Sequence, residues 1–398
     1  MENLNSVCYV QRISEIREIP GADKIELAII NGWNSIVNKG GHKVGDLVVI
    51  ATTDAVIPEQ TSTHLNIKNY LRGGSRVRTI KLRGVYSECL ILPINYIPEK
   101  YRKEGVDCME LMGIFKYEPP VEIVKLSSGR KVKRQANLNF HVYYKFPNLK
   151  NKPGMFNESD IVEITRKIHG TNARYGLVKK NKLSFFDKVK KFFGVADSLI
   201  DYEFVYGSHN VQKGSSTQSF YETDVWYTIA IENKIEEKLR EYARTHLNEI
   251  GNGIIIYGEI FGPGIQKGYD YGFRHIAFNM FDCEINGEYV SPNRSGIISQ
   301  WLELDYVPVL YYGNWSQDVQ DKYVFNNFIS RGDILATNSY HRTPEGTFRN
   351  EQDDITSKKI PHEGIVIKHH TGDRNRVAKV INPDYLIYAE KHNVGDSH

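Results

Sequence analysis

Several short apolar runs in the second half of the chain carry charged residues where a strand would be buried. The run "GIIIYGEIFG" holds Glu259, "HEGIVIKHH" holds Glu363 and Lys368, and "RVAKVINPDYL" places Lys379 among aliphatic neighbours. A lone ammonium or carboxylate in an apolar strand costs free energy unless it is paired. The shortness of these runs and the glycines beside them favour antiparallel strands over long helices. The fold must therefore bring these charged groups to partners.

Lys167 lies at a turn between two further strand candidates. It follows "DIVEIT" and precedes "NARYGLV". At such a turn a side chain can point into a cleft; the alternative is a surface lysine in a tight glycine turn. A second Lys-x-x-Gly begins at Lys191, but it lies on an amphipathic stretch whose lysines are expected to face water. We therefore predict that Lys167 is a nucleophile.

Composition is that of a soluble protein of two domains. The chain has 398 residues, more than one ordinary core supports, and a net charge of only +3. Four cysteines without metal-type spacing favour a reducing compartment, so we expect the cytoplasm or the nucleus. No secretion signal opens the sequence, and no apolar run approaches the ~20 residues of a membrane span. We therefore expect no membrane partner.

Two regions of different character follow one another. Residues 1–115 contain short strand candidates and glycine turns, which favours a small β-barrel. Residues 116–138 include a polar, basic stretch and are predicted to be a linker. Residues 139–398 mix strands with two helix candidates, 185–195 and 231–250, and the expected class is α+β with antiparallel sheets. In the second helix candidate, four apolar residues recur at helical spacing: Ile231, Ile235, Leu239 and Tyr242.

The order and the residues of these segments resemble those of the covalent nucleotidyltransferase superfamily, and more closely those of the ATP-dependent RNA ligases. "KIHGTN" at Lys167 resembles motif I, and "YGEIFGPGIQKGYDYG" resembles motif III and its extension. "FD" at Phe281 resembles motif IIIa, "EGIVIK" motif IV and "AKV" motif V. The run "GPGIQKG" favours RNA ligases over DNA ligases and capping enzymes.

The N-terminal region extends the resemblance over nearly the whole chain. "GADKIELAIINGW", "VGDLVVIATTDAVIPE" and "VRTIKLRG" are similar to the OB-fold module that precedes the catalytic domain in Deinococcus-type RNA ligases, family 5. The resemblance implies an N-terminal OB-fold β-barrel at 1–115, a linker, and an ATP-grasp-like ligase domain of antiparallel sheets and helices at 139–398. Most DNA ligases instead carry their OB domain after the catalytic domain.

The resemblance implies an RNA ligase that seals 3′-OH and 5′-phosphate ends at nicks, through a lysyl-AMP and an adenylylated 5′ end. The implied cofactors are ATP, as the AMP donor, and Mg²⁺ or Mn²⁺. The implied partner is RNA, or an RNA/DNA duplex with nicks, bound by a monomer. A free lysine has a pKa near ~10.4, so the nucleophile needs help to lose its proton. A cation such as Lys379 beside it would lower that pKa.

Family motifs also imply a role for each residue. Lys167 would carry the AMP, Glu259 would hold the ribose, and Phe281 would stack on adenine. Glu363 would hold metal-bound water, because hydrated Mg²⁺ prefers sparse carboxylate contacts. Lys368 and Lys379 would neutralise the α-phosphate. The remaining ATP-binding candidates lie in the motif I loop: His169, Gly170 and Asn172.

Three residues depart from the family pattern. Arg166 stands before the nucleophile where relatives often have Glu, and Ile381 stands where some have a second motif V lysine. His209 replaces an end-binding arginine, and a neutral histidine holds phosphate only weakly.

A basic stretch of the N-terminal region is a candidate nucleic-acid surface. We favour binding to the phosphate backbone, because OB-folds use such faces; a solvated edge strand protected by charge is the alternative. Basic residues of the linker could extend this surface. The candidates within the stretch are Arg72, Arg76, Arg78, Lys81 and Arg83.

Two other functions remain open from the sequence. A DNA ligase or a capping enzyme would use the same covalent chemistry, and choice of nucleotide and of strand would distinguish them. A catalytically inactive nucleic-acid-binding protein is the second, although Lys167, Glu259, Glu363 and Lys379 are all present.

Overall fold

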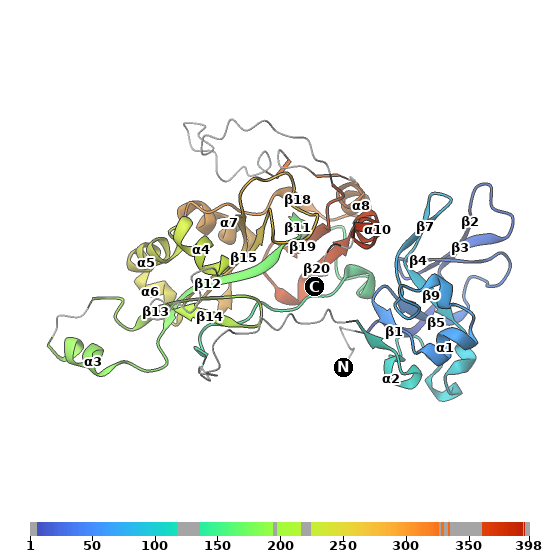
Figure 1. Cartoon of the computed structure of the whole chain (residues 1–398), viewed down its shortest axis with the longest axis horizontal. Helices are drawn as coiled ribbons and strands as arrows, with labels where there is room; N and C mark the ends of the chain where they lie inside the picture. Colours follow the sequence, from blue (N-terminus) through green and yellow to red (C-terminus); the bar gives the residue numbers. More distant parts are fainter. Residues whose placement is uncertain are drawn as a thin grey trace.

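The computed structural model describes residues 6–117, 136–193, 197–215, 224–325 and 360–392, and five further residues at 328–329, 333–334 and 394. The N-terminal strands form one end of the molecule, and the helix at 185–192 lies at the opposite end (Figure 1). Most of the predicted linker, with its basic residues from Lys125 to Arg134, lies outside the described residues.

The N-terminal region is built from small antiparallel sheets. One sheet has the order β1-β5-β9, a second β2-β3-β4, and two-stranded pairs join β7 to β8 and β6 to β10. Its elements are β1 (Cys8–Arg12), β2 (Glu15–Glu18), β3 (Ile25–Ile30), β4 (Trp33–Asn38), β5 (Leu47–Thr52), β6 (Ala55–Val56), α1 (Glu59–His64), β7 (Ile80–Leu82), β8 (Val85–Ser87), β9 (Cys89–Leu92), α2 (Met109–Met112) and β10 (Phe115–Lys116).

The expected barrel is not closed by strand ladders within the described residues. Where β4 meets β8 and β9, the link is one main-chain bond, from Glu88 N to Asn34 O at 2.7 Å, together with side-chain bonds. Ser35 Oγ donates to Cys89 O at 3.0 Å, and the Ser87 hydroxyl accepts from the amide of Ile36. Strands of two to six residues are too short to extend a continuous ladder around the module.

The second region contains two antiparallel sheets. The six-stranded sheet has the order β14-β13-β12-β15-β16-β17, and the four-stranded sheet β18-β11-β19-β20. The strands are β11 (Ile161–Lys167), β12 (Thr171–Lys179), β13 (Tyr202–Gly207), β14 (Gln212–Ser215), β15 (Gly253–Phe261), β16 (Ala277–Ile285), β17 (Glu288–Tyr289), β18 (Val309–Asn314), β19 (Gly364–His369) and β20 (Val377–Ile381). The helices are α3 (Phe185–Phe192), α4 (Val225–Glu232), α5 (Ile235–Thr245), α6 (Leu247–Ile250), α7 (Pro292–Trp301), α8 (Gln317–Val324) and α10 (Pro383–His392).

Strand β15 is the centre of the larger core. Ile254 and Ile256 face the cluster formed with α5 and α7, whereas Ile255 and Tyr257 face an aromatic cluster around Tyr143. A strand covered on both faces needs a nearly continuous apolar sequence, which "GIIIYGEIF" supplies. Its one charged residue, Glu259, is therefore placed at the edge of this core.

The predicted helix at 231–250 is divided in the structure. Ile235, Leu239 and Tyr242 are buried on α5, but Ile231 lies in the last turn of α4 and is 60% exposed. Lys234 has a φ of 52°, a left-handed conformation that interrupts a helix. The prediction of one helix over 231–250 was wrong because periodicity does not reveal this break.

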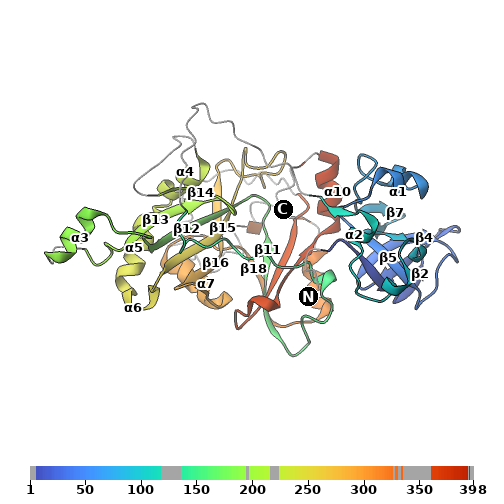
Figure 2. The ribbon, with the colours of Figure 1, turned by 90° about the horizontal axis from the view of Figure 1, so that it is seen from below.

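The two regions contact each other through α10 and the segment before β11. Arg78 Nη1 lies 2.6 Å from Glu390, Tyr86 Oη donates to Asp384 at 2.6 Å, and Lys150 Nζ lies 2.6 Å from Glu88. Figure 2 shows α10 beside the N-terminal strands. Among the described helices, none is long and apolar enough to cross a membrane.

Candidate active site

Lys167 ends β11, and the register of the sheet gives it a carboxylate partner. Lys167 pairs with Gly364 across the antiparallel ladder, so Glu363 stands directly beside it. Lys167 Nζ donates to Glu363 Oε1 at 2.5 Å. The Glu363 side chain is fully buried, and that of Lys167 is 20% exposed. The predicted nucleophile is thus an accessible amine held by a buried acid.

The loop after Lys167 is fixed from several sides. The amide of His169 donates to Tyr271 Oη at 2.7 Å, and the His169 ring lies 3.1 Å from Tyr385 Oη. Gln266 Nε2 donates to Gly170 O at 2.7 Å. A Cβ at Gly170 would stand 2.2 Å from the main-chain oxygen of Ile260 on β15, so only glycine fits there. This packing fixes the direction in which Lys167 leaves the sheet.

Strands β12 and β15 bring Asn172 opposite Glu259. Burial raises the pKa of the Glu259 carboxyl to about 8; Lys167 opposes this rise and Glu363 adds to it. Two acidic groups therefore act on one ammonium at this place. A cation or a ligand hydroxyl is the partner that such a pair favours.

Lys379 approaches the same group from β20. Its amide donates to Pro147 O at 3.0 Å, and Val366 is its partner on β19. Burial lowers the pKa of Lys379 to about 8, and the charge of Lys167 lowers it further, while Glu363 opposes the shift. Lys116 and Asp54, from the N-terminal region, also act on Lys379. Four sequence-predicted residues thus influence one another electrostatically: Lys167, Glu259, Glu363 and Lys379.

Phe281 and Lys368 belong to a buried network behind these residues. Lys368 Nζ donates to Phe281 O at 2.6 Å and lies 3.0 Å from Asp282 Oδ2. Arg374 Nη1 lies 2.7 Å from the same oxygen, and Tyr143 Oη donates to it at 2.8 Å. The Phe281 ring meets Tyr143 edge to face at 4.9 Å and stays partly exposed. The phosphate role expected of Lys368 stays a prediction, because its contacts here are structural.

Burial would raise the pKa of Asp282, but the charges of Lys368 and Arg374 outweigh it and lower that pKa. Sequence reasoning noticed Asp282 only as a neighbour of Phe281 and missed Arg374 entirely. It also missed Tyr271 and Tyr385, which contact the nucleophile loop. The available signal for Tyr271 was the "YDYG" end of the motif III extension.

The family models identify the chain. The RNA ligase model matches residues 160–381, which is more than half of the sequence. The chain belongs to the RNA ligase family. A model described as an OB-fold domain matches residues 7–94. These matches place the ligase motifs in one region and the OB-fold in the other, in the expected order.

Solved structures show the same fold over the whole chain. A structure titled Naegleria gruberi RNA ligase with PPi is 22% identical, has a TM-score of 0.67, and the match covers 98% of this chain and 99% of that one. A mutant of the same enzyme with ATP and Mn has 22% identity and a TM-score of 0.68, over 97% and 99% of the chains. A mutant with AMP and Mn has 21% identity and a TM-score of 0.66, over 98% and 99%. A comparison with curated proteins finds no match.

The structure shows the surroundings of the three residues that depart from the RNA ligase pattern. Arg166 points away from Lys167, and its Nη1 donates to Tyr323 O at 3.2 Å near the end of α8. His209 follows β13, where burial and the charges of Lys145 and Arg174 lower its pKa. Ile381 ends β20 and packs against the larger core. Arg166 and Ile381 therefore support the fold of the ligase domain.

The basic stretch of the OB-fold module does not form one open strand face. Arg76 Nε donates to Asp54 at 3.0 Å, and its guanidinium lies 3.8 Å from the Tyr117 ring centroid. Arg78 is paired with Glu390, and Lys81 lies 3.5 Å from Asp384. Strand β7 begins only at Ile80, so the expected alternation does not extend over the whole stretch. Arg72 and Arg83 have no ion pair among the described contacts.

Metal ligands are sparse around Lys167. Within the described part of the chain, no three histidine, cysteine or acidic side chains gather as a metal site. Glu259 and Glu363 still provide carboxylates of like charge in close electrostatic contact, which a divalent cation would relieve. Mg²⁺ commonly uses only one or two protein carboxylates besides substrate phosphates, so this donor set fits.

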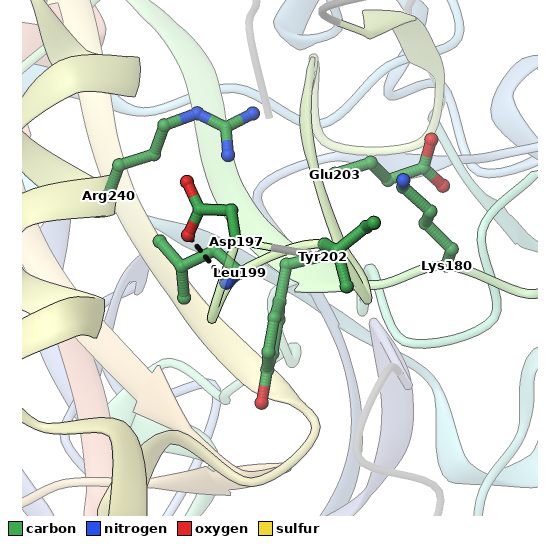
Figure 3. Close-up of a pocket in the computed structure, with 7 residues that line it drawn as sticks. Lys180, Asp197, Leu199, Tyr202, Glu203 and Arg240 are labelled. Atoms are coloured by element: carbon green, nitrogen blue, oxygen red, sulfur yellow. Dashed lines mark hydrogen bonds between the residues drawn. The ribbon is translucent and has the colours of Figure 1, made fainter. Parts of the chain in front are cut away.

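A separate hollow lies at the base of α3. It encloses about 240 Å³ and is lined by residues of both charges, including Lys180, Arg240, Asp197 and Glu203 (Figure 3). Its lining shares no residue with the Lys167 group. We assign it no part in ligation.

Replacing Glu259 with glutamine is expected to change the pH dependence of stability. The pKa of Glu259 is raised from 4.5 to about 8 in the folded chain, so its stabilising contribution is complete below 4.5 and lost as the pH rises through about 8. Glutamine cannot ionise. Glu259→Gln should therefore raise the melting temperature of the nucleotide-free protein more at pH ~9 than at pH ~5. An equal difference at both values would contradict the assignment; Glu288→Gln, at an exposed carboxyl, is the control.

Proposed function

We propose that this member of the RNA ligase family uses ATP to seal 3′-OH and 5′-phosphate RNA ends, through AMP attached to Lys167. The observation that carries the proposal is the pairing of Lys167 Nζ with buried Glu363, beside Glu259 and Lys379. The ATP, AMP and Mn named in the titles of the Naegleria structures support the same chemistry. We also propose the division into 1–115, 116–138 and 139–398, a resemblance to family 5, and a monomer in a reducing compartment.

The first step transfers AMP to the enzyme. Lys167 Nζ, once deprotonated, attacks the α-phosphorus of ATP; the P–N bond forms as the bond to the β-phosphate oxygen breaks and pyrophosphate leaves. The cationic charge of Lys379 attracts the phosphate. Gly170 and Gln266 keep the loop in place, so that the amine stays aimed while the phosphate charge develops.

Later steps use the same residues on a new acceptor. The adenylate passes from Lys167 to the 5′-phosphate of an RNA end, which restores the free amine. The 3′-OH then attacks that phosphate and releases AMP. A bound divalent cation, held by Glu363 and Glu259, would neutralise phosphate charge. His209, whose pKa is lowered by burial and by the charges of Lys145 and Arg174, would contact the strand end as a neutral imidazole.

Covalent labelling tests the proposal. The full-length protein should form a labelled adduct from α-labelled ATP with Mg²⁺ or Mn²⁺, stable to denaturing electrophoresis, and should lose the label to a 5′-phosphorylated nicked duplex. GTP should label it weakly. Preferential labelling by GTP would favour a capping enzyme, and equal sealing of nicks that lack any ribonucleotide would favour a DNA ligase. A protein that binds nicked RNA but takes no label would be a binding protein only.

Phe281→Leu is expected to weaken capture of ATP more than it weakens sealing of a pre-adenylylated strand. Loss of one base stack costs ~1–3 kcal/mol, which is about fivefold to more than a hundredfold in apparent ATP affinity. The measurement compares the ATP concentration dependence of labelling with single-turnover sealing. Phe278→Leu, in the buried core of the same strand, is the matched control. Equal losses in both assays would make Phe281 a core residue.

We further propose that Arg72 and Arg83 of the OB-fold module bind the phosphate backbone. Each lost phosphate contact lowers the slope of log affinity against log salt by about 0.9 for a duplex. The double variant Arg72→Ala/Arg83→Ala should therefore bind nicked duplex with a slope shallower by about two and should retain adenylylation. Arg12→Ala/Arg17→Ala, elsewhere on the module, is the control. An unchanged salt slope would remove these residues from the interface.

A further inference from the structure

The most exposed aromatic side chains of the described chain gather on one short helix. Four phenylalanines at α3 are 69–84% exposed: Phe185, Phe186, Phe192 and Phe193. An exposed group of this size needs a partner, because large apolar patches are rare on free surfaces. Neither the OB-fold module nor the Lys167 group contacts this helix, which lies at the far end of the molecule in both views (Figure 1 and Figure 2).

The helix is firmly placed despite its small contact area. Residues 180–201 connect β12 to β13, and the amide of Lys180 donates to Asp201 O at 2.8 Å across the base. Ser184 and Asp187 form a capping box at the start of the helix. Lys180 Nζ lies 3.0 Å from Asp187, and Lys191 Nζ lies 2.7 Å from Asp201. The phenylalanines therefore project from an arm, defined here as residues 180–193, that ion pairs and a main-chain hydrogen bond connect to its base.

The arm has the pattern of an interfacial helix. Phe185, Val189 and Phe192 stand at i, i+4 and i+7, and with Phe186 they span an apolar arc of about 120°. Lys188 and Lys190 flank this arc on its two sides. Residues 180–193 contain five lysines and one acid, Asp187, so their net charge is +4. Phenylalanine on one side and lysine on the other is the composition of helices that lie in a membrane surface.

We propose that the α3 arm binds the surface of an anionic lipid bilayer. The phenylalanines enter the headgroup region, and Lys182, Lys188 and Lys190 face the lipid phosphates. This revises the expectation of no membrane partner, which rested on the absence of a secretion signal and of a membrane span in the sequence. A helix lying on the surface buries one face and needs no such length.

Other occupants of the arm fit less well. A second copy would bring two arms of charge +4 together, which is unfavourable. A duplex offers phosphates to the lysines but does not cover the phenylalanines. Single-stranded RNA stacks on aromatic rings lining a basic groove, whereas these rings lie on a convex helix. A lipid surface alone matches the charge, the exposed rings and the convex shape.

Co-sedimentation of the full-length protein with vesicles tests the proposal. Binding is expected with phosphatidylcholine vesicles that contain about one third phosphatidylserine, and little binding with phosphatidylcholine alone. It should weaken as salt is raised, because lysine–lipid attraction is screened within ~10 Å at 0.1 M and ~3 Å at 1 M. Absence of binding to the anionic vesicles would overturn the proposal.

Two pairs of variants separate the parts of the arm. Phe185→Ser/Phe192→Ser should lower vesicle binding by about tenfold or more, and Phe115→Ser, at an exposed phenylalanine of the OB-fold module, should not. Lys188→Glu/Lys190→Glu should abolish the preference for anionic lipid, and Lys24→Glu/Lys103→Glu should preserve it. Covalent AMP labelling, measured on every variant, reports correct folding independently. Unchanged vesicle binding in the phenylalanine variant, or a loss of RNA binding in its place, would overturn the proposal.

Discussion

Lys167→Ala is expected to lose covalent AMP labelling completely. In the proposed mechanism the Lys167 amine forms the phosphoramidate, and the other lysine of the described site, Lys379, enters from a different strand, β20. The measurement is the label retained on the full-length protein after denaturing electrophoresis. Lys167→Arg should be equally inactive, because a guanidinium stays protonated and is a poor nucleophile.

Lys191 provides the matched control for this experiment. Lys191 starts the other Lys-x-x-Gly sequence. It lies on the α3 arm, where it is paired with Asp201 at the base of the arm. Lys191→Ala should therefore label as the unmodified protein does. Addition of a pre-adenylylated strand bypasses the first step, so Lys167→Ala should recover part of its sealing there. Persistent labelling of Lys167→Ala, with Lys191 as the modified residue, would overturn the assignment of the nucleophile.

The sequence predicted which residues form the site better than it predicted how they are arranged in space. Lys167, Glu259, Glu363 and Lys379 were predicted from lone charges in apolar runs and from motif resemblance. Their grouping in the structure depends on sheet register, in which Lys167 opposes Gly364 and Asn172 opposes Glu259. Register follows from the apolar pattern of whole strands. The sequence of β11 alone does not reveal which strand will pair with it.

Side-chain partners across long sequence separations could not be predicted. Arg78 was assigned to RNA from its neighbours in sequence, yet it pairs with Glu390, 312 positions away. The motif predicts a phosphate role for Lys368, which stays a prediction, but it did not reveal that Lys368 contacts Asp282 in the core. In both cases a charged side chain has several possible partners, and only the packing of separate elements selects one. The fold class could be predicted, because periodicity and motif order can be read from the sequence without knowing which side chains meet in the fold.

The network around Asp282 leads to the second large effect, a loss of stability. Asp282 is fully buried and accepts hydrogen bonds from Lys368, Arg374 and Tyr143. Asp282→Asn keeps the shape of the side chain but removes its charge, which leaves buried Lys368 and partly buried Arg374 without the carboxylate that they share. Breaking a buried pair in this way costs about 3–5 kcal/mol. The midpoint of urea unfolding should fall accordingly, with the slope unchanged.

The pH dependence gives this prediction a second measurement. The two cations lower the pKa of Asp282 below its usual 3.8, against the opposing effect of burial, so its contribution is present above that value and is lost as the pH falls through the folded-state pKa. The difference between the unmodified protein and Asp282→Asn should therefore be constant near neutral pH and shrink only in strong acid. Asp201→Asn, which removes an exposed partner of Lys191, should cost less than about 1 kcal/mol. If Asp282→Asn costs as little as Asp201→Asn, Lys368 and Arg374 find other partners. The position of Phe281, whose carbonyl accepts a hydrogen bond from Lys368, would then not depend on this network.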